Sequence, residues 1–194
     1  SIKNSELDES DPLRKYKARL VFSGHRITDE YGAEAVFDDL ASSTTTMAAT
    51  RFTVAAGHQY GWVCELSDAE SAYLQAELTG EATWVELPEF LWLSSWVGRF
   101  TRPMVLLKRA LYGHPQAGLL WERKRDLILK ELQFLPVPEW PSIYRNPDGA
   151  ILNIYVDDFM LSCPRAKAPE VWRKLGLLIK LGASEALSRF LGCV

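Results

Sequence analysis

Two largely apolar runs with a pair of carboxylates between them constrain the fold of this 194-residue chain more than any other stretch. Residues 151–156 suit a buried strand, Asp157 and Asp158 follow, and residues 159–161 are apolar again. Neighbouring side chains of a regular strand point to opposite faces, so both carboxylates serve one site only if the chain turns there. The sequence therefore predicts a β-hairpin that carries two acids at its tip.

Two carboxylates so close together repel each other when ionised, and a bound cation is the usual relief. Mg²⁺ suits such a pair because it prefers oxygen ligands and keeps waters and substrate phosphates in its remaining positions. An Asp-Asp pair taken alone is more often just a polar turn. The metal site is favoured by a third carboxylate, Asp68, which ends a strand predicted over residues 62–67 and precedes a helix predicted over 70–78.

These stretches resemble motifs A and C of the reverse transcriptases of copia-type LTR retrotransposons. Asp68 followed five positions later by Tyr73 matches motif A, and Tyr-Val-Asp-Asp at residues 155–158 matches motif C. The likeness covers nearly the whole chain after the first dozen residues. Further matches follow in the family's order: Lys-Ala-Arg-Leu-Val at 17–21, Ala-Leu-Tyr-Gly at 110–113, Gln116-Ala117 with Trp121, and Phe-Leu-Gly at 190–192.

The resemblance implies an α+β fold, the fingers and palm of a reverse transcriptase, with a mostly antiparallel palm sheet packed by helices. The alternation of predicted strands and helices points to the same class. We expect residues 1–194 to form one such domain, with 1–14 as a flexible lead and with the thumb and RNase H domain absent. Further strands are predicted at 15–22, 83–86, 104–107, 142–145 and 189–193, and helices at 46–56 (capped within 42–45), at 115–132 and from Pro169.

The resemblance assigns catalysis and metal binding to the three acids. Asp68 and Asp157 are expected to bridge two Mg²⁺ ions, or Mn²⁺ in their place, and Asp158 completes the site. The implied reaction is the addition of dNTPs to a primer 3′-hydroxyl by two-metal phosphoryl transfer, with metals ~3.5–4 Å apart. Asp68 and Asp157 must then lie within about 8 Å of each other. Asp68 has a simpler possible role as a helix N-cap, and that role does not exclude metal binding.

Four residues are assigned to the nucleotide: Tyr73, Lys17, Arg19 and Gln116. In the family, the aromatic residue at Tyr73 excludes a ribose 2′-hydroxyl, which implies dNTP substrates; an ordinary core tyrosine is the alternative. Lys17 and Arg19 alternate along a predicted strand, so both face one way and suit a triphosphate. A solvated strand edge explains them equally well.

Gln116 opens the second long helix, where it can meet the nucleotide or the template. The family usually has proline two places later, where this chain has Gly118, so its local geometry stays open. Lys108, Arg109 and Tyr155 are assigned to nucleic acid. The basic run 123–125 suits either a phosphate backbone or a solvated helix face.

Composition restricts the class of protein to which the chain can belong. The net charge of -3 and the pI near 5.7 do not indicate a nucleic-acid binder, so local basic patches must hold an RNA or DNA template with its primer. Three scattered cysteines predict neither a disulfide framework nor a zinc site. No run approaches the ~18–20 apolar residues of a membrane span, so we expect no membrane contact and an intracellular protein.

The family implies a cytoplasmic virus-like particle, with the nucleus as the alternative, and neighbouring integrase and RNase H domains as partners. Two rival functions stay open. One is a catalytically inactive palm fragment that acts as a nucleic-acid-binding or remnant domain. The other is an RNA-binding module of the RRM type, which needs exposed aromatic residues on its central strands rather than acids at strand ends.

Overall fold

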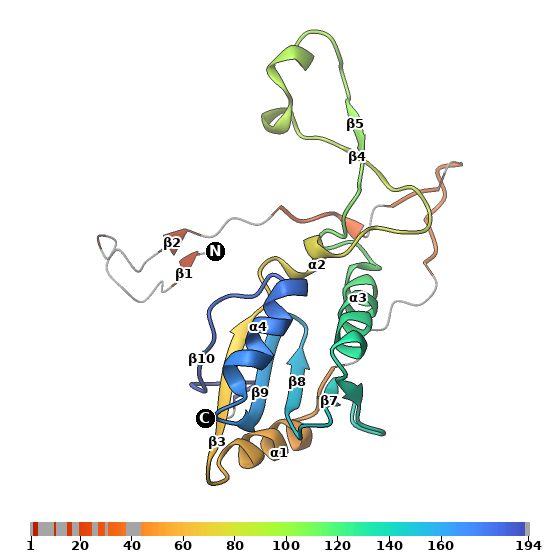
Figure 1. Ribbon diagram of the computed structural model, residues 1–194. Coiled ribbons are helices and arrows are strands. Elements are labelled where there is room, and N and C mark those ends of the chain that lie inside the picture. The colour runs from red at the N-terminus through yellow and green to blue at the C-terminus, as the bar shows by residue number, and fades with distance from the viewer. Residues whose placement is uncertain are drawn as a thin grey trace.

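The computed structural model describes residues 2–3, 10, 15–16, 20–24, 27–29, 31–37 and 44–192. A six-stranded sheet is the centre of the fold, and each pair of neighbouring strands in it is antiparallel (Figure 1). The expected α+β class with a mostly antiparallel sheet is confirmed. The strands follow the order β10 (Glu185–Ala186), β3 (Trp62–Asp68), β9 (Asp158–Pro164), β8 (Ile151–Tyr155), β7 (Ile143–Arg145) and β6 (Leu135–Pro136).

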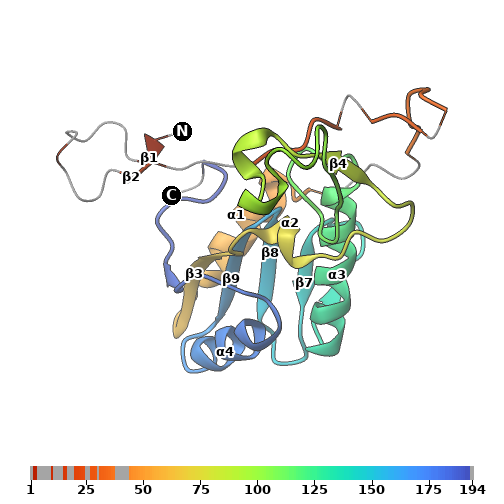
Figure 2. The ribbon, with the colours of Figure 1, turned by 90° about the horizontal axis from the view of Figure 1, so that it is seen from above.

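Helices cover both faces of this sheet, which explains why β8 and β9 are mostly apolar and buried. Leu152 and Phe159 belong to the core cluster that also contains residues of α3 (Ala117–Glu131) and α4 (Ala168–Leu178). On the other face, Ser162 donates a hydrogen bond to Thr53 O in α1 (Met47–Gly57). Figure 2 shows the sheet between α1 on one side and α4 on the other, with α3 beside β7.

Helix α1 lies close to the sheet because it ends in a glycine. A Cβ on Gly57 would lie 2.6 Å from the Cβ of Cys64 and 2.8 Å from Ser162 Oγ. At its start, Thr46 Oγ1 accepts the N–H of Ala49, so the cap is one residue later than predicted. The predicted helix over 46–56 is otherwise confirmed, while Ser42 and Ser43 lie outside the described residues.

The helix α2 is much shorter than predicted. It spans only Ala72–Gln75 instead of residues 70–78. Ser71 before it has a φ of +53°, and Ala76 after it is extended, so the chain leaves helical geometry at both ends. Tertiary bonds compete with the helix here, since Glu70 N–H donates to Lys180 O and Ala110 N–H donates to Ala76 O.

Two predicted strands differ from the structure at the ends of the chain. Within the predicted strand 15–22, Lys15–Tyr16 form β2, which pairs with β1 (Ile2–Lys3). The described residues 20–22 are not a strand, and residues 17–19 lie outside the described part of the chain. The predicted strand 189–193 is wrong for the described residues 189–192, among which Phe190 forms only an isolated bridge. The strand that joins the sheet edge is β10, which begins four residues before Arg189. The lead predicted over residues 1–14 falls mostly outside the described residues.

A separate two-stranded ribbon, β4 (Trp84–Glu86) with β5 (Met104–Leu106), projects away from the sheet (Figure 1). Two short 3₁₀ turns, Glu89–Leu91 and Ser94–Trp96, form its far end. Among the helices that the structure describes, none has the length and apolarity to cross a membrane.

Candidate active site at the end of the sheet

Three acids from two distant segments meet where β3 and β8 end and β9 begins. Asp68 closes β3 directly opposite Asp158, the first residue of β9, and opposite residues of antiparallel strands share a face. Asp157 lies in the turn between β8 and β9. Each of the three carboxylates offers an oxygen within 4.8 Å of the others. The expected approach of Asp68 to Asp157 within about 8 Å is therefore confirmed.

The backbone around these acids is held from several directions. Ala69 N–H donates to Asp157 O at 2.7 Å, which ties the residue after Asp68 directly to the turn. Gly182 N–H donates to Asp68 O at 2.8 Å, and Ser67 Oγ donates to Gly182 O at 2.9 Å. The carboxylates thus project from a rigid base.

The electrostatics of the site favour a cation. Partial burial, followed by the charges of Asp157 and Asp68, raises the pKa of Asp158 to about 6. Three carboxylates that share a small volume are costly to ionise, and a divalent ion with oxygen ligands removes that cost. The donor set and the 4.8 Å clustering therefore fit one or two Mg²⁺ or Mn²⁺ ions.

Tyr73 lies on α2, which follows the strand that ends at Asp68. Burial raises the pKa of its hydroxyl, and the charges of Asp157 and Tyr155 raise it further. Its ring packs on Tyr112 with 4.6 Å between the ring centroids. Tyr112 was not predicted as a site residue, although it lies in the Ala-Leu-Tyr-Gly stretch. Tyr155 ends β8 opposite Asp158 and is half-buried.

Gln116 lies just before α3, close to the loop that supports Tyr112. Its N–H donates to His114 Nδ1, so the neutral His114 ring carries its proton on Nε2, which contacts Thr83 Oγ1 at 3.3 Å. Within the described residues the Gln116 side chain makes no capping bond to the helix and is half-buried. Its role in nucleotide or template binding stays a prediction.

The described residues 20–24 meet the same loop through Phe22. Phe22 N–H donates to Tyr112 O at 2.7 Å, and the rings of Phe22 and His114 lie 5.5 Å apart. Gly113 allows this approach, since a Cβ there would lie 2.0 Å from Phe22 O. Lys17 and Arg19 precede this contact but lie outside the described residues.

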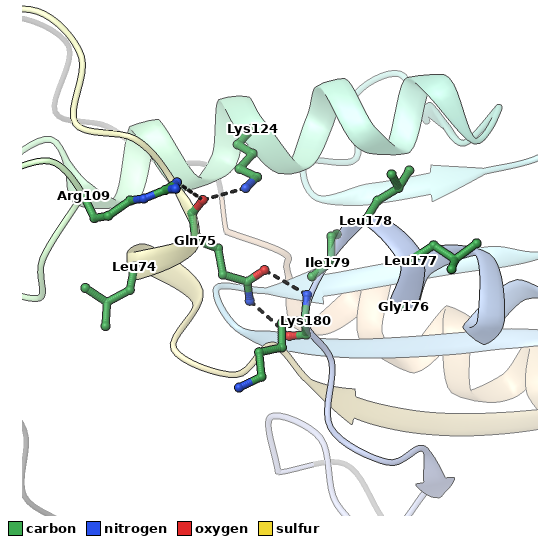
Figure 3. Close-up of a pocket in the computed structure, with 9 residues that line it drawn as sticks. All are labelled: Leu74, Gln75, Arg109, Lys124, Gly176, Leu177, Leu178, Ile179 and Lys180. Atoms are coloured by element: carbon green, nitrogen blue, oxygen red, sulfur yellow. Dashed lines mark hydrogen bonds between the residues drawn. The ribbon is translucent and has the colours of Figure 1, made fainter.

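A hollow of about 490 Å³ lies beside α2, the helix that follows Asp68, and Gln75 lies at its centre (Figure 3). The Gln75 side chain exchanges hydrogen bonds with the backbone of Lys180. The backbone carbonyl of Gln75 accepts hydrogen bonds from Lys124 Nζ at 2.5 Å and from Arg109 Nη1 at 3.3 Å. Arg109 also lies 3.7 Å from Glu77. Arg109 is thus anchored at the rim of the hollow, and Lys108 beside it is exposed.

The basic run 123–125 forms neither a continuous phosphate-binding surface nor a solvated face. Arg123 is exposed, whereas Lys124 points into the hollow of Figure 3. The Arg125 side chain is 2 % exposed and donates to Asp126 and to the Tyr144 hydroxyl, with 2.9 Å to the latter. Both predicted roles are therefore wrong for Arg125, which is a core residue.

A comparison with known protein families covers nearly the whole chain. Residues 4–193 match the model of a protein family described as reverse transcriptase (RNA-dependent DNA polymerase). The match includes all three acids and both segments that carry them.

Proposed function

Because the chain belongs to the reverse transcriptase family, of the copia type, we propose that it adds deoxynucleotides to a primer 3′-hydroxyl at the acidic triad. The family is that of RNA-directed DNA polymerases, which are nucleotidyltransferases and act on a template with its primer and on dNTPs. The observation that carries the proposal is the clustering of Asp68, Asp157 and Asp158 within 4.8 Å.

The acids of the triad have different positions and therefore different proposed roles. Asp68 and Asp157 are held by backbone hydrogen bonds at the strand end and in the turn, and these two are the proposed bridging ligands. Asp158 lies opposite Asp68 and completes the set. Two divalent ions bound there would activate the primer hydroxyl and stabilise the leaving pyrophosphate.

Tyr73 is proposed to exclude ribonucleotides. The charge of Asp157 raises the pKa of the Tyr73 hydroxyl, and the Tyr73 ring packs against Tyr112 with 4.6 Å between the centroids, which supports a place for this ring near the metal ligands. A sugar with a 2′-hydroxyl would have to displace this supported ring. We therefore expect dNTPs to be the substrates.

The remaining assignments concern nucleotide and nucleic acid. Lys17 and Arg19 are proposed for the triphosphate and Gln116 for the nucleotide or template, all by resemblance. Lys108, Arg109 and Tyr155 are proposed to contact the template and primer. For Arg109 the support is its anchored position at a basic rim shared with Lys124 and Lys180 (Figure 3).

We further propose that the chain supplies the fingers and palm within a retrotransposon polyprotein that includes integrase and RNase H domains. Its place of action would be a cytoplasmic virus-like particle or the nucleus. These proposals rest on the family alone.

Primer extension tests the proposed reaction. The chain is mixed with a primed RNA template, dNTPs and Mg²⁺, and we expect incorporation that Asp157→Asn abolishes. Asp148→Asn is the matched control, because Asp148 is an exposed carboxylate at the opposite end of β8 and pairs with Lys167. Template binding without incorporation by the unaltered chain, with Mg²⁺ or Mn²⁺, would contradict the proposal and favour a binding module.

A second experiment tests the substrate. Tyr73→Ala is expected to increase the use of ribonucleotides relative to dNTPs, whereas Tyr73→Phe retains the ring and hence the preference. Equal discrimination by both variants would show that Tyr73 is an ordinary core residue.

A further inference from the structure

Trp121 connects the core of the protein to the turn that carries Asp157. Its side chain is 1 % exposed on the inner side of α3. Its indole N–H donates a hydrogen bond of 2.7 Å to Val156 O, the carbonyl immediately before Asp157. The indole does not reach the reacting atoms, so any effect on the chemistry must act through the turn.

That turn has an unfavourable backbone. Of its two central residues, Val156 has a φ of +56°, while Asp157 is not among the residues with positive φ. This is the pattern of a type II′ hairpin turn, in which glycine is preferred at the first central position. A β-branched residue there is strained, and such strain persists only where the surroundings enforce it.

The peptide between Val156 and Asp157 is the part of the turn that can rotate while the strands stay paired. Rotating it would convert the type II′ pattern into type I′ and change the φ of Asp157 to a positive value. The Trp121 indole binds this peptide at its carbonyl, and Ala69 N–H binds the next carbonyl at 2.7 Å. The two donors hold consecutive peptides and so fix the direction of the Asp157 side chain.

We propose that Trp121 is a positioning residue of the active site: its indole N–H holds the Val156–Asp157 peptide in the orientation that brings the Asp157 carboxylate to Asp68 and Asp158. The proposal rests on the function proposed above. It assigns a task to the buried tryptophan that α3 carries beneath the site, separate from its contribution to core packing.

The test removes the N–H and retains a ring. Trp121→Phe is compared with Trp172→Phe, because Trp172 on α4 also donates its indole N–H, to Glu65 Oε2 at 2.7 Å, at a place outside the triad. Both variants lose one hydrogen bond and part of one ring. Mn²⁺ alone is titrated into each protein by calorimetry, thermal unfolding is recorded, and primer extension is measured with template affinity determined separately.

Trp121→Phe is expected to weaken Mn²⁺ binding about five- to tenfold, the equivalent of one hydrogen bond. It should lower kcat with little change in template affinity. Trp172→Phe should lower the unfolding midpoint to a similar extent and leave Mn²⁺ affinity unchanged. The positioning role of Trp121 is refuted if both variants bind Mn²⁺ as tightly as the unaltered protein does. It is also refuted if both variants lose the same amount of Mn²⁺ affinity.

A second substitution keeps the test valid if Trp121→Phe does not fold. Site-specific incorporation of 3-benzothienylalanine at position 121 preserves the shape of the indole and replaces only its N–H by sulfur. The same loss of Mn²⁺ affinity is expected, and an unchanged affinity overturns the proposal. If the unaltered protein itself neither binds Mn²⁺ nor extends primers, the proposed function fails instead, so the two failures are distinguishable.

Discussion

Removal of one acid of the triad is expected to stabilise the metal-free protein. The pKa of Asp158 is raised from an ordinary 3.8 to about 6 by burial and by its two neighbours, so the folded state holds this proton more tightly than the unfolded chain. At about 1.4 kcal/mol per pH unit the full linkage is about 3 kcal/mol at neutral pH. Because Asp158 is exposed, screening reduces this, and we expect about 1 kcal/mol.

The sign determines the pH window. A raised carboxyl pKa costs stability as pH rises from about 4 to 6, and the cost is constant above that range. Asp158→Asn removes the ionisable group, so in EDTA it should gain about 1 kcal/mol over the unaltered chain at pH 7.5. At pH 4 most of that gain should be absent.

Urea unfolding at the two pH values measures this difference. Asp148→Asn is again the control, because Lys167 lowers the pKa of Asp148, and this variant should gain no stability. Added Mg²⁺ should stabilise the unaltered chain more than Asp158→Asn and so close the gap. A gain that is equal at both pH values, or no gain at pH 7.5, would refute the electrostatic reasoning.

Three further predictions concern the framework. Gly57→Ala should cost about 1–3 kcal/mol in urea unfolding because its methyl group meets Cys64. Gly176→Ala, at an exposed position of α4 with open space around it, should stabilise by up to about 1 kcal/mol; equal effects of the two changes would contradict the close packing of α1. Burial lowers the pKa of His114, so the contribution of this residue to stability is present above pH about 6.5 and is lost on acidification. His114→Gln should therefore lose less of its thermal midpoint between pH 8 and pH 5 than the unaltered chain does. An equal loss in the two proteins would refute this. Arg125→Met should cost about 2 kcal/mol, measured by thermal unfolding, and an unchanged midpoint would show that its buried hydrogen bonds contribute nothing.

The acidic hairpin was predictable from local sequence because its signals are local. An apolar run, two acids and a second apolar run determine strand, turn and strand, and β8 and β9 follow that pattern. The pairing of Asp68 with Asp158 is different, since it joins residues far apart in the chain. Only the resemblance to a family brought them together, and the register then followed from the structure.

Elements that depend on tertiary contacts were not predictable in the same way. The predicted helix after Asp68 is cut short by bonds to Lys180 and Ala110, which lie far away in sequence. Arg125 looked solvated among basic neighbours, but it lies four residues from both Trp121 and Leu129 on the buried stripe of α3. That spacing was visible in the sequence and is the signal that should have identified it.

The indole contact to the turn belongs to a third class. Trp121 was visible as part of a family-like segment, yet its hydrogen bond to Val156 O depends on how α3 lies against the sheet. No periodicity predicts the direction of a single N–H group. Hydrogen bonds to the backbone that carries an active-site residue become visible only in the three-dimensional structure.

Anomalous diffraction from crystals soaked in Mn²⁺ and a dNTP tests the central claim most directly. We expect Mn²⁺ peaks at about 2.0–2.2 Å from carboxylate oxygens of Asp68 and Asp157, with the triphosphate in the remaining positions. Crystals of Asp157→Asn should show the peaks weakened or absent. Peaks that avoid the triad, or a triad that stays free of metal at saturating Mn²⁺, would contradict the account.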